Sequence, residues 1–307
     1  MRGGGSSENR ALELAHFSLN PHITLTSFTH PLRHPIKNHC VFFPYLYFWL
    51  THSGRNRLLH ITNRICGAVF KKMPLDIQWW YRRWFFVEQW TNAKLCHAHH
   101  TMLKSHNFAF ANNAYVCGCF QNLEYFSALK DTLQKEFRLK TPLSAANARL
   151  KEKILQTPDS VFLHIRRGDY LNLWHFIELG SAYYNNALRE IKARVQRPNV
   201  FVFSNDILWC EQHFLQSLDS KVREGVRFEF VRGNSETNAA EEMELMRSCK
   251  HAIIANSTFS WWAAYLIGYK DKVVCMPRYI FCNPHYAPND LANYLQCPGW
   301  ILINHIW

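Results

Sequence analysis

The sequence lacks an apolar run long enough to cross a membrane. The longest candidate, Val41–Leu50, has about half of the roughly 20 consecutive apolar residues that a spanning helix requires, and it contains Pro44. The first ten residues, MRGGGSSENR, carry no apolar segment after Arg2, so neither a signal peptide nor a membrane anchor is expected. We therefore expect a soluble, cytoplasmic protein.

The sequence also lacks a disulfide framework and a metal-binding pattern. The 10 cysteines are scattered and form no C-x-x-C motif, which favours reduced thiols. The segment Cys96–His100 contains side chains of metal-ligand type, but no second cluster follows at the spacing of a zinc site. We therefore expect no bound metal.

Acidic residues are scarce in the first 110 positions, which hold 4 of them against 13 lysines and arginines, together with 11 of the 17 histidines. The whole chain has a formal net charge of +12, so anionic partners are favoured. The aromatic and basic run Trp79–Phe86 could stack on bases or lie at a membrane interface, although a packed amphipathic helix is the favoured interpretation. No nucleic-acid motif is present, so we expect peripheral contact with an anionic membrane surface and no nucleic-acid partner.

From about residue 120 onward, short apolar runs alternate with helical patterns, which is typical of βαβ units and a mostly parallel sheet. The segment Lys140–Ala146 is the favoured linker, and it divides the chain into domains at 1–145 and 146–307. The predicted helices are Phe120–Phe137, Ser181–Arg194 and Glu241–Ser248, and the predicted strands are Ser160–Ile165, Asn199–Ser204 and Ala252–Ala255.

Polar residues follow three of these predicted strands, at the edge where ligands bind in doubly wound folds. The first set is His164-Ile165-Arg166-Arg167-Gly168-Asp169-Tyr170, in which two arginines suit a diphosphate clamp. We expect one arginine to point inward and the other to support it, and a purely structural salt bridge is the alternative. In the second set, Asp206 could hold a base or a ribose hydroxyl, or it could cap a helix.

The third set, Asn256–Ser260, lies between a predicted strand and a predicted helix. A helix N-terminus with Ser and Thr hydroxyls favours an anionic group, so this segment could complete the clamp that Arg166 begins. Structural capping is the alternative for Ser257, Thr258 and Ser260. Trp261 and Trp262, which follow them, are expected in the core.

Together these segments resemble the α-1,2-fucosyltransferases of glycosyltransferase family 11. The similarity is nearly letter for letter at His164–Tyr170 and Cys249–Leu266, and it extends over about residues 115 to 280, including Gly118–Phe126. The resemblance implies an α/β, GT-B-like pair of Rossmann-type domains with mostly parallel sheets, an N-terminal acceptor-side domain and a C-terminal domain that binds GDP-fucose. It also implies inverting transfer of fucose to O2 of a terminal galactose in an oligosaccharide or lipopolysaccharide O-antigen.

By this resemblance, Arg166 binds the diphosphate, and His164 and Asp206 lie near the nucleoside. The phosphates are lined by Ser257, Thr258 and Ser260, Asn256 and Asp169 hold the loops of the donor site, and Asp169 or Glu178 serves as the base. The chain has no D-x-D triplet to mount a metal–nucleotide complex, so a metal-independent reaction without a cofactor is implied.

The family's glycine-rich N-terminal loop aligns with Gly5–His16, where Asn9 is retained on the acceptor side but most of the glycine turn is not. Glu8 would place a negative charge near a diphosphate. Two alternatives therefore stay open: a GDP-sugar-binding homologue with impaired turnover, and fucosyl transfer to a different acceptor.

Overall fold

The computed structural model describes residues 16–18, 121–168, 178–234, 238–280 and 291–304, together with the backbone of 94–98 and 114–118. The chain divides into two compact units, one made of Met1–Leu25 and Gln121–Trp307, the other of Thr26–Phe120. In the second unit, β1 (Lys94–Ala98) and β2 (Ala114–Gly118) pair in parallel, with Lys94 opposite Ala114. The domain boundary between 145 and 146 and the GT-B arrangement stay predictions.

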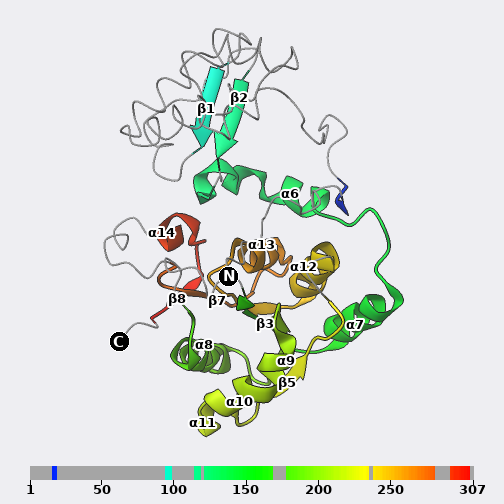
Figure 1. The fold of residues 1–307 in the computed structure, drawn as a ribbon, viewed down its shortest axis with the longest axis vertical. Coiled ribbons are helices and arrows are strands. Elements are labelled where there is room, and N and C mark those ends of the chain that lie inside the picture. The colour runs from blue at the N-terminus through cyan, green and yellow to red at the C-terminus, as the bar shows by residue number, and fades with distance from the viewer. Residues whose placement is uncertain are drawn as a thin grey trace, which may run out of the picture. The chain divides into compact units, whose positions relative to one another are not determined.

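The first unit is built on a parallel sheet of six strands in the order β5-β4-β3-β6-β7-β8 (Figure 1). The central strand β3 is buried on both faces from Ser160 to Ile165, as expected for a continuous apolar run in a parallel sheet. It pairs with β4 and β6, with Phe162 opposite Phe201 and Ala252. The strands are β3 (Ser160–Ile165), β4 (Asn199–Ser204), β5 (Arg227–Phe230), β6 (His251–Ile253), β7 (Val274–Pro277) and β8 (Ile301–Ile303).

Helices cover both faces of this sheet and enclose two apolar cores. On one face, α7 (Ala145–Gln156), α12 (Ala239–Ser248), α13 (Thr258–Leu266) and α14 (Leu291–Leu295) bury residues such as Phe162. On the other, α8 (Ser181–Arg194), α9 (Ile207–Trp209), a π-helical turn (Cys210–Phe214), α10 (Leu215–Ser217) and α11 (Ser220–Arg223) cover residues such as Leu163. The sheet between two helical layers confirms the α/β prediction.

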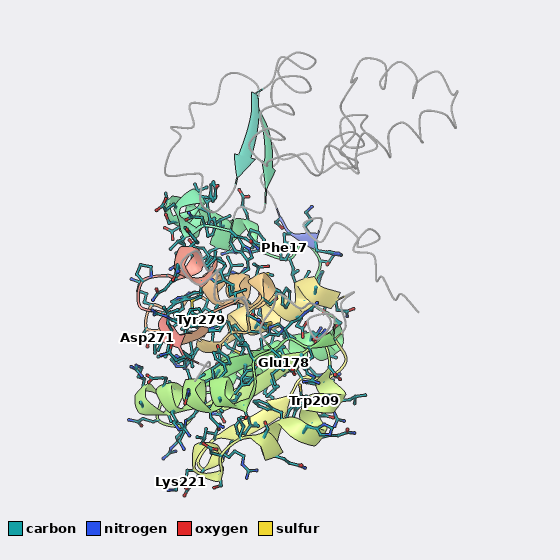
Figure 2. All side chains as sticks on the ribbon, turned by 60° about the vertical axis from the view of Figure 1, so that its left-hand side comes forward. Phe17, Glu178, Trp209, Lys221, Asp271 and Tyr279 are labelled. Atoms are coloured by element: carbon teal, nitrogen blue, oxygen red, sulfur yellow. The ribbon has the colours of Figure 1, made fainter. Side chains whose placement is uncertain are left out.

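The α12–α13 face is extended by an aromatic cluster. Two 3-10 turns, Leu123–Tyr125 and Ser127–Leu129, lead into α6 (Lys130–Glu136) where one helix over Phe120–Phe137 was expected. Phe126 lies 5.0 Å, ring to ring, from Trp262, and Phe17 lies 5.1 Å from Phe137, beside α6 (Figure 2). Trp261 is buried and donates a hydrogen bond to the Leu295 carbonyl at 2.8 Å, so the two tryptophans belong to the core, as predicted.

The predicted elements agree closely with the structure. The strands Ser160–Ile165 and Asn199–Ser204 and the helix Ser181–Arg194 have the expected bounds. The helix predicted at Glu241–Ser248 begins two residues earlier, at Ala239, and the strand predicted at Ala252–Ala255 lies at His251–Ile253. No helix among the described residues is long and apolar enough to span a membrane.

Candidate active site

The tandem arginines after β3 lie on opposite faces of the sheet. Side chains alternate along a strand, and Phe162 belongs to the core under α12 and α13, whereas Leu163 and Ile165 belong to the core under α8. His164 follows the parity of Phe162, and its ring lies 5.9 Å from that of Phe259 in α13. The same alternation carries Arg166 to the α12–α13 face and Arg167 to the α8–α9 face.

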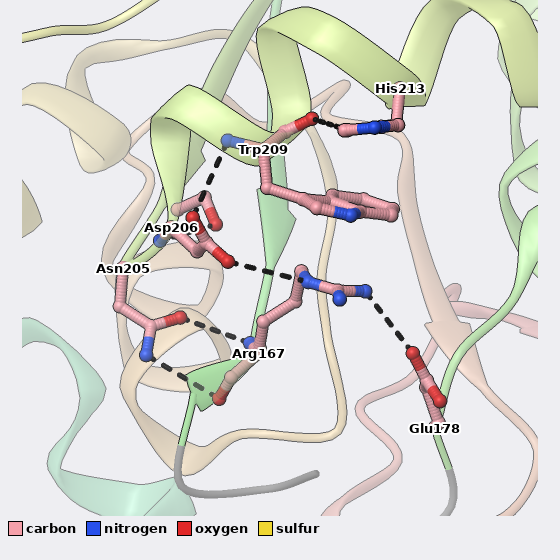
Figure 3. A network of polar contacts seen from close by, with 7 residues as sticks. Arg167, Glu178, Asn205, Asp206, Trp209 and His213 are labelled. Carbon is pink, nitrogen blue, oxygen red and sulfur yellow. Dashed lines mark hydrogen bonds and ion pairs between the residues drawn. The ribbon is translucent and has the colours of Figure 1, made fainter.

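Arg167 is held by partners from the protein (Figure 3). Its Nη1 lies 3.1 Å from Oε1 of Glu178, its Nε lies 3.6 Å from Oδ2 of Asp206, and its guanidinium carbon lies 3.5 Å from the centre of the Trp209 ring. Only 16% of the side chain is exposed. The expectation that one arginine of the pair supports the other therefore fits Arg167.

The turn that follows Arg167 requires a glycine. Gly168 has a φ of +61°, in the left-handed region, and a Cβ there would lie 2.6 Å from Nδ2 of Asn205. The Asn205 amide clasps the neighbouring residue: its Oδ1 accepts from the Arg167 backbone N–H at 3.0 Å, and its Nδ2 donates to the Arg167 carbonyl at 3.4 Å. The ends of β3 and β4 are thereby tied together.

On the opposite face, three ionisable side chains interact at the carboxyl edge of the sheet. The His164 imidazole is buried, and burial together with the nearby Arg166 charge lowers its pKa to about 3, so the ring is neutral at physiological pH. Glu242, in the first half of α12, has a pKa raised to about 7 by burial, although the positive charge of Arg166 opposes the shift. Arg166 thus acts electrostatically on both neighbours.

The N-terminus of α13 lies at the same edge, directly after β6. Ser257 is the N-cap residue and its side chain makes no capping hydrogen bond; Thr258 is exposed. The Ser260 hydroxyl, in contrast, is buried and fully used, because it accepts from the Ala255 N–H at 3.2 Å and donates to the Ser257 carbonyl at 3.1 Å. Buried Asn256 reaches the Ile280 carbonyl at 3.5 Å. Ser260 and Asn256 shape the turn, and Ser257 and Thr258 border its outer side.

The predicted site residues therefore divide into two groups. The structure brings His164, Arg166 and the segment 256–260 to the face of α12 and α13. Glu178 and Asp206 lie with Arg167, and Asp206 also caps α9 by accepting from the Trp209 N–H at 3.4 Å, which is the capping alternative considered for it. The predicted base Asp169 and the acceptor-side Asn9 lie outside the described residues.

Two residues of this edge were not singled out from the sequence. Glu242 stands in a run of three glutamates within four residues, and nothing in that run distinguishes it from Glu241 or Glu244. Trp209, which stacks on Arg167, follows β4 in the sequence but belongs to no motif that would mark it. Within the described ranges, no cluster of three His, Cys, Asp or Glu side chains could hold a metal ion. The expectation of no metal and no cofactor stays a prediction.

Comparison with known proteins gives a family match for the chain. A family model described as "Glycosyl transferase family 11" matches residues 64–304, which include every described element from β1 to β8. The chain belongs to glycosyl transferase family 11. The family resemblance inferred from the three motifs is therefore confirmed, and so is the prediction of a glycosyltransferase at the level of the family.

The relatives of this family 11 chain include bacterial and mammalian enzymes. It is 31% identical to an alpha-1,2-colitosyltransferase of Escherichia coli over 65% of this chain and 66% of the relative. It is 32% identical to the O-antigen biosynthesis glycosyltransferase WbnK of Escherichia coli over 80% of this chain and 76% of the relative. Galactoside alpha-(1,2)-fucosyltransferase 1 of Rattus norvegicus is 30% identical over 59% of this chain, and the match spans 48% of its length. No solved structure matches the chain.

Proposed function

We propose that the protein transfers fucose from GDP-fucose to O2 of a terminal galactose, forming an α-1,2 linkage with inversion. The observation that carries the proposal is that Arg166 and the N-terminus of α13 follow the ends of two paired strands, β3 and β6, at the carboxyl edge of a parallel sheet. A guanidinium and the backbone N–H groups of a helix N-terminus are a pair of groups suited to a diphosphate. The relatives named as α-1,2-glycosyltransferases support the linkage.

The chemistry follows from charge developing on the leaving group. As the bond between the sugar and the diphosphate breaks, the sugar acquires oxocarbenium character and the diphosphate gains negative charge. Arg166 and the α13 N-terminus would stabilise that charge without a metal ion or cofactor, with Ser257 and Thr258 beside the phosphates. Asp169 or Glu178 would take the proton of the acceptor hydroxyl; the Glu178 carboxylate is 60% exposed and pairs with Arg167.

A second donor is favoured by one relative. The alpha-1,2-colitosyltransferase covers 65% of this chain at 31% identity, which is as similar as the fucosyltransferases are. Colitose is fucose without its 3-hydroxyl, so one site could discriminate between the two sugars by a single hydrogen bond. For the acceptor, the relative named for O-antigen biosynthesis favours an oligosaccharide or lipopolysaccharide, reached from the cytoplasm at an anionic membrane surface.

The test is a transfer assay with purified protein, lactose as acceptor, and GDP-fucose or GDP-colitose as donor. GDP release with each donor is measured, with and without EDTA, and the linkage of the product is determined by NMR. A 2-O-linked product from GDP-fucose that forms equally well in EDTA is expected. Binding of GDP-fucose without GDP release on any galactoside would favour the impaired homologue, and a reaction with GDP-colitose alone would replace fucose as the donor sugar.

A further inference from the structure

The carboxylate of Glu242 has an unusual environment. It is half-buried in α12, yet no described residue donates a hydrogen bond to it, and among the described residues the one charge that shifts its pKa is that of Arg166. Its two neighbours in the glutamate run differ, since Glu241 accepts hydrogen bonds from Ser144 and Asn147 and Glu244 pairs with Lys151 at 2.6 Å. A carboxylate removed from water without donors is costly, so a bound ligand is the natural source of its partners.

A second polar atom in this region also lacks a partner. Nδ1 of His164 is buried and makes no hydrogen bond to the described part of the chain, and the ring is neutral because burial and Arg166 lower its pKa. The imidazole lies against Phe259 of α13, with 5.9 Å between the ring centres. A neutral ring, an aromatic side chain and an unpaired carboxylate suit a planar, uncharged group better than a second phosphate.

The topology fixes where this group would lie. The helix α12 leaves the end of β5 and returns to the start of β6, so its first turns lie at the same carboxyl edge as His164 and Arg166. Arg166 acts electrostatically on both Glu242 and His164, so these two side chains lie near the arginine that would hold the diphosphate. In a nucleoside diphosphate, the uncharged planar part attached to the phosphates through the ribose is the base.

We propose that Glu242 recognises the nucleobase of the sugar donor and selects guanine. This inference rests on the proposed function, because it takes a nucleotide sugar as the donor. The carboxylate accepts the N1–H and the exocyclic 2-amino group of guanine through its two oxygens. Arg166, held nearby, binds the diphosphate of the same molecule.

The arrangement of hydrogen-bond donors on the nucleobases favours guanine. A carboxylate only accepts hydrogen bonds, and its two oxygens suit two adjacent N–H donors. Guanine presents such a pair on its Watson–Crick edge. Adenine and cytosine place a ring-nitrogen acceptor next to the amino group, and uracil flanks its one N–H with two carbonyls, so each would bring an acceptor against the carboxylate.

The experiment measures nucleotide affinity by calorimetry for GDP, IDP and ADP, with the wild-type protein and Glu242→Gln. IDP lacks the 2-amino group and so loses one charge-assisted hydrogen bond, which corresponds to about tenfold weaker binding or more than GDP. ADP is expected to bind more weakly still. In Glu242→Gln the affinity for GDP falls and the ratio between GDP and IDP approaches one, because a neutral amide offers one acceptor and a donor instead of two acceptors.

The matched control is Glu244→Gln, on the same helix, which removes the ion pair with Lys151 and is expected to leave the ratio unchanged. A GDP to IDP ratio that survives in Glu242→Gln overturns the inference, including the case in which this variant loses turnover alone and Glu242 acts as a base. If GDP does not bind the wild-type protein, or Arg166→Ala leaves its binding unchanged, the proposed function fails. These outcomes distinguish the two proposals.

Discussion

The two arginines on opposite faces of the sheet have different surroundings. On the α8–α9 face, Arg167 is surrounded by protein partners: Glu178, Asp206 and the Trp209 ring. On the α12–α13 face, Arg166 acts on a buried neutral histidine and on a glutamate that receives no hydrogen bond from the described residues. The first arrangement gives its arginine ion-pair and stacking partners from the protein, although its Nε makes no hydrogen bond to the described residues. The second contains polar groups whose partners a ligand would supply.

This contrast shows how a tandem pair of identical residues can hold two roles. Because side chains alternate along a strand, the two arginines lie on opposite faces of the sheet, and each contacts a different set of helices. A guanidinium with two carboxylates and a stacked ring is neutralised and rigid, and so it braces the turn. The arginine on the other face acts electrostatically on His164 and Glu242.

The largest expected effect is that of Arg166→Ala on nucleotide binding. Loss of a bidentate, charge-assisted contact to a diphosphate corresponds to about 2 to 4 kcal/mol, so the Kd for GDP should rise by roughly 30- to 1000-fold. Calorimetric titration with GDP measures this, and circular dichroism checks the fold. Arg166→Lys keeps the charge without the planar fork and should recover only part of the affinity. An unchanged Kd in a folded Arg166→Ala protein would show that the clamp lies elsewhere.

The next effect concerns the turn shared by the two faces. Gly168→Ala places a Cβ 2.6 Å from the Asn205 amide at a φ of +61°, so we expect a loss of about 2 kcal/mol in the free energy of unfolding. The amide clasp that sets the position of Arg167 would shift as well. Urea denaturation measures the loss. Gly268→Ala is the control, because a Cβ there meets nothing within 4 Å, and equal stability of the two variants would contradict the expectation.

Much of the fold was predictable because the local signals agree with the tertiary structure. The run SVFLHI is apolar throughout and becomes the central strand β3, buried on both faces. The pattern of Ser181–Arg194 becomes α8, with Tyr183, Leu188 and Ile191 turned into the core. Phe120–Phe137 was harder: the expected helix breaks into two 3-10 turns before α6, where Phe126 packs between Trp261 and Trp262. That contact is remote in sequence, and a local pattern does not contain it.

The candidate site was predictable in part. Strand ends and helix N-termini indicated Arg166, His164 and the segment 256–260, because backbone topology alone brings these together. The assignment of Asp206 depended on which face its side chain meets, and the structure places it with Arg167 and at the N-terminus of α9. Glu242 could not be distinguished from Glu241 or Glu244 because its special feature is that no described residue donates a hydrogen bond to it, which depends on packing between helices.

A smaller effect is expected at the braced arginine. Arg167→Ala removes two ion pairs and the contact with the Trp209 ring, so we expect about 1 to 2 kcal/mol of lost stability, since the side chain is mostly buried. Thermal unfolding of the variant measures this. GDP affinity, in contrast, should change by less than about threefold, which is a small fraction of the effect at Arg166. A large loss of affinity with unchanged stability would reverse the roles of the two arginines.

The last expected effect is a pH dependence that belongs to the α12–α13 face alone. Burial raises the pKa of Glu242 to about 7, and the hydrogen bonds proposed with guanine require the ionised carboxylate. Between pH 8 and pH 6 the ionised fraction falls about tenfold at most, so GDP affinity should fall by a similar factor. Among the described residues that face Glu242, His164 has a pKa of about 3 and stays neutral in this range, and the Arg166 side chain is a guanidinium, a group that proteins do not deprotonate. Lys151 of α7 is paired with Glu244, and α13 carries no charged side chain.

The variant Glu242→Gln isolates this titration from that of the nucleotide phosphates, since both proteins bind the same ligand. At each pH, the GDP affinity of the wild type is divided by that of the variant. This ratio should rise as the pH increases through about 7. Without nucleotide, the stability contributed by Glu242 should instead fall as the pH rises. A carboxyl whose pKa is raised on folding stabilises the fold below its unfolded pKa and loses that contribution as pH rises through the folded value. Relative to Glu242→Gln, the wild type should therefore become less stable from pH 5 to pH 8, as measured by urea denaturation. A flat difference would show that the Glu242 carboxylate is solvated and has no raised pKa.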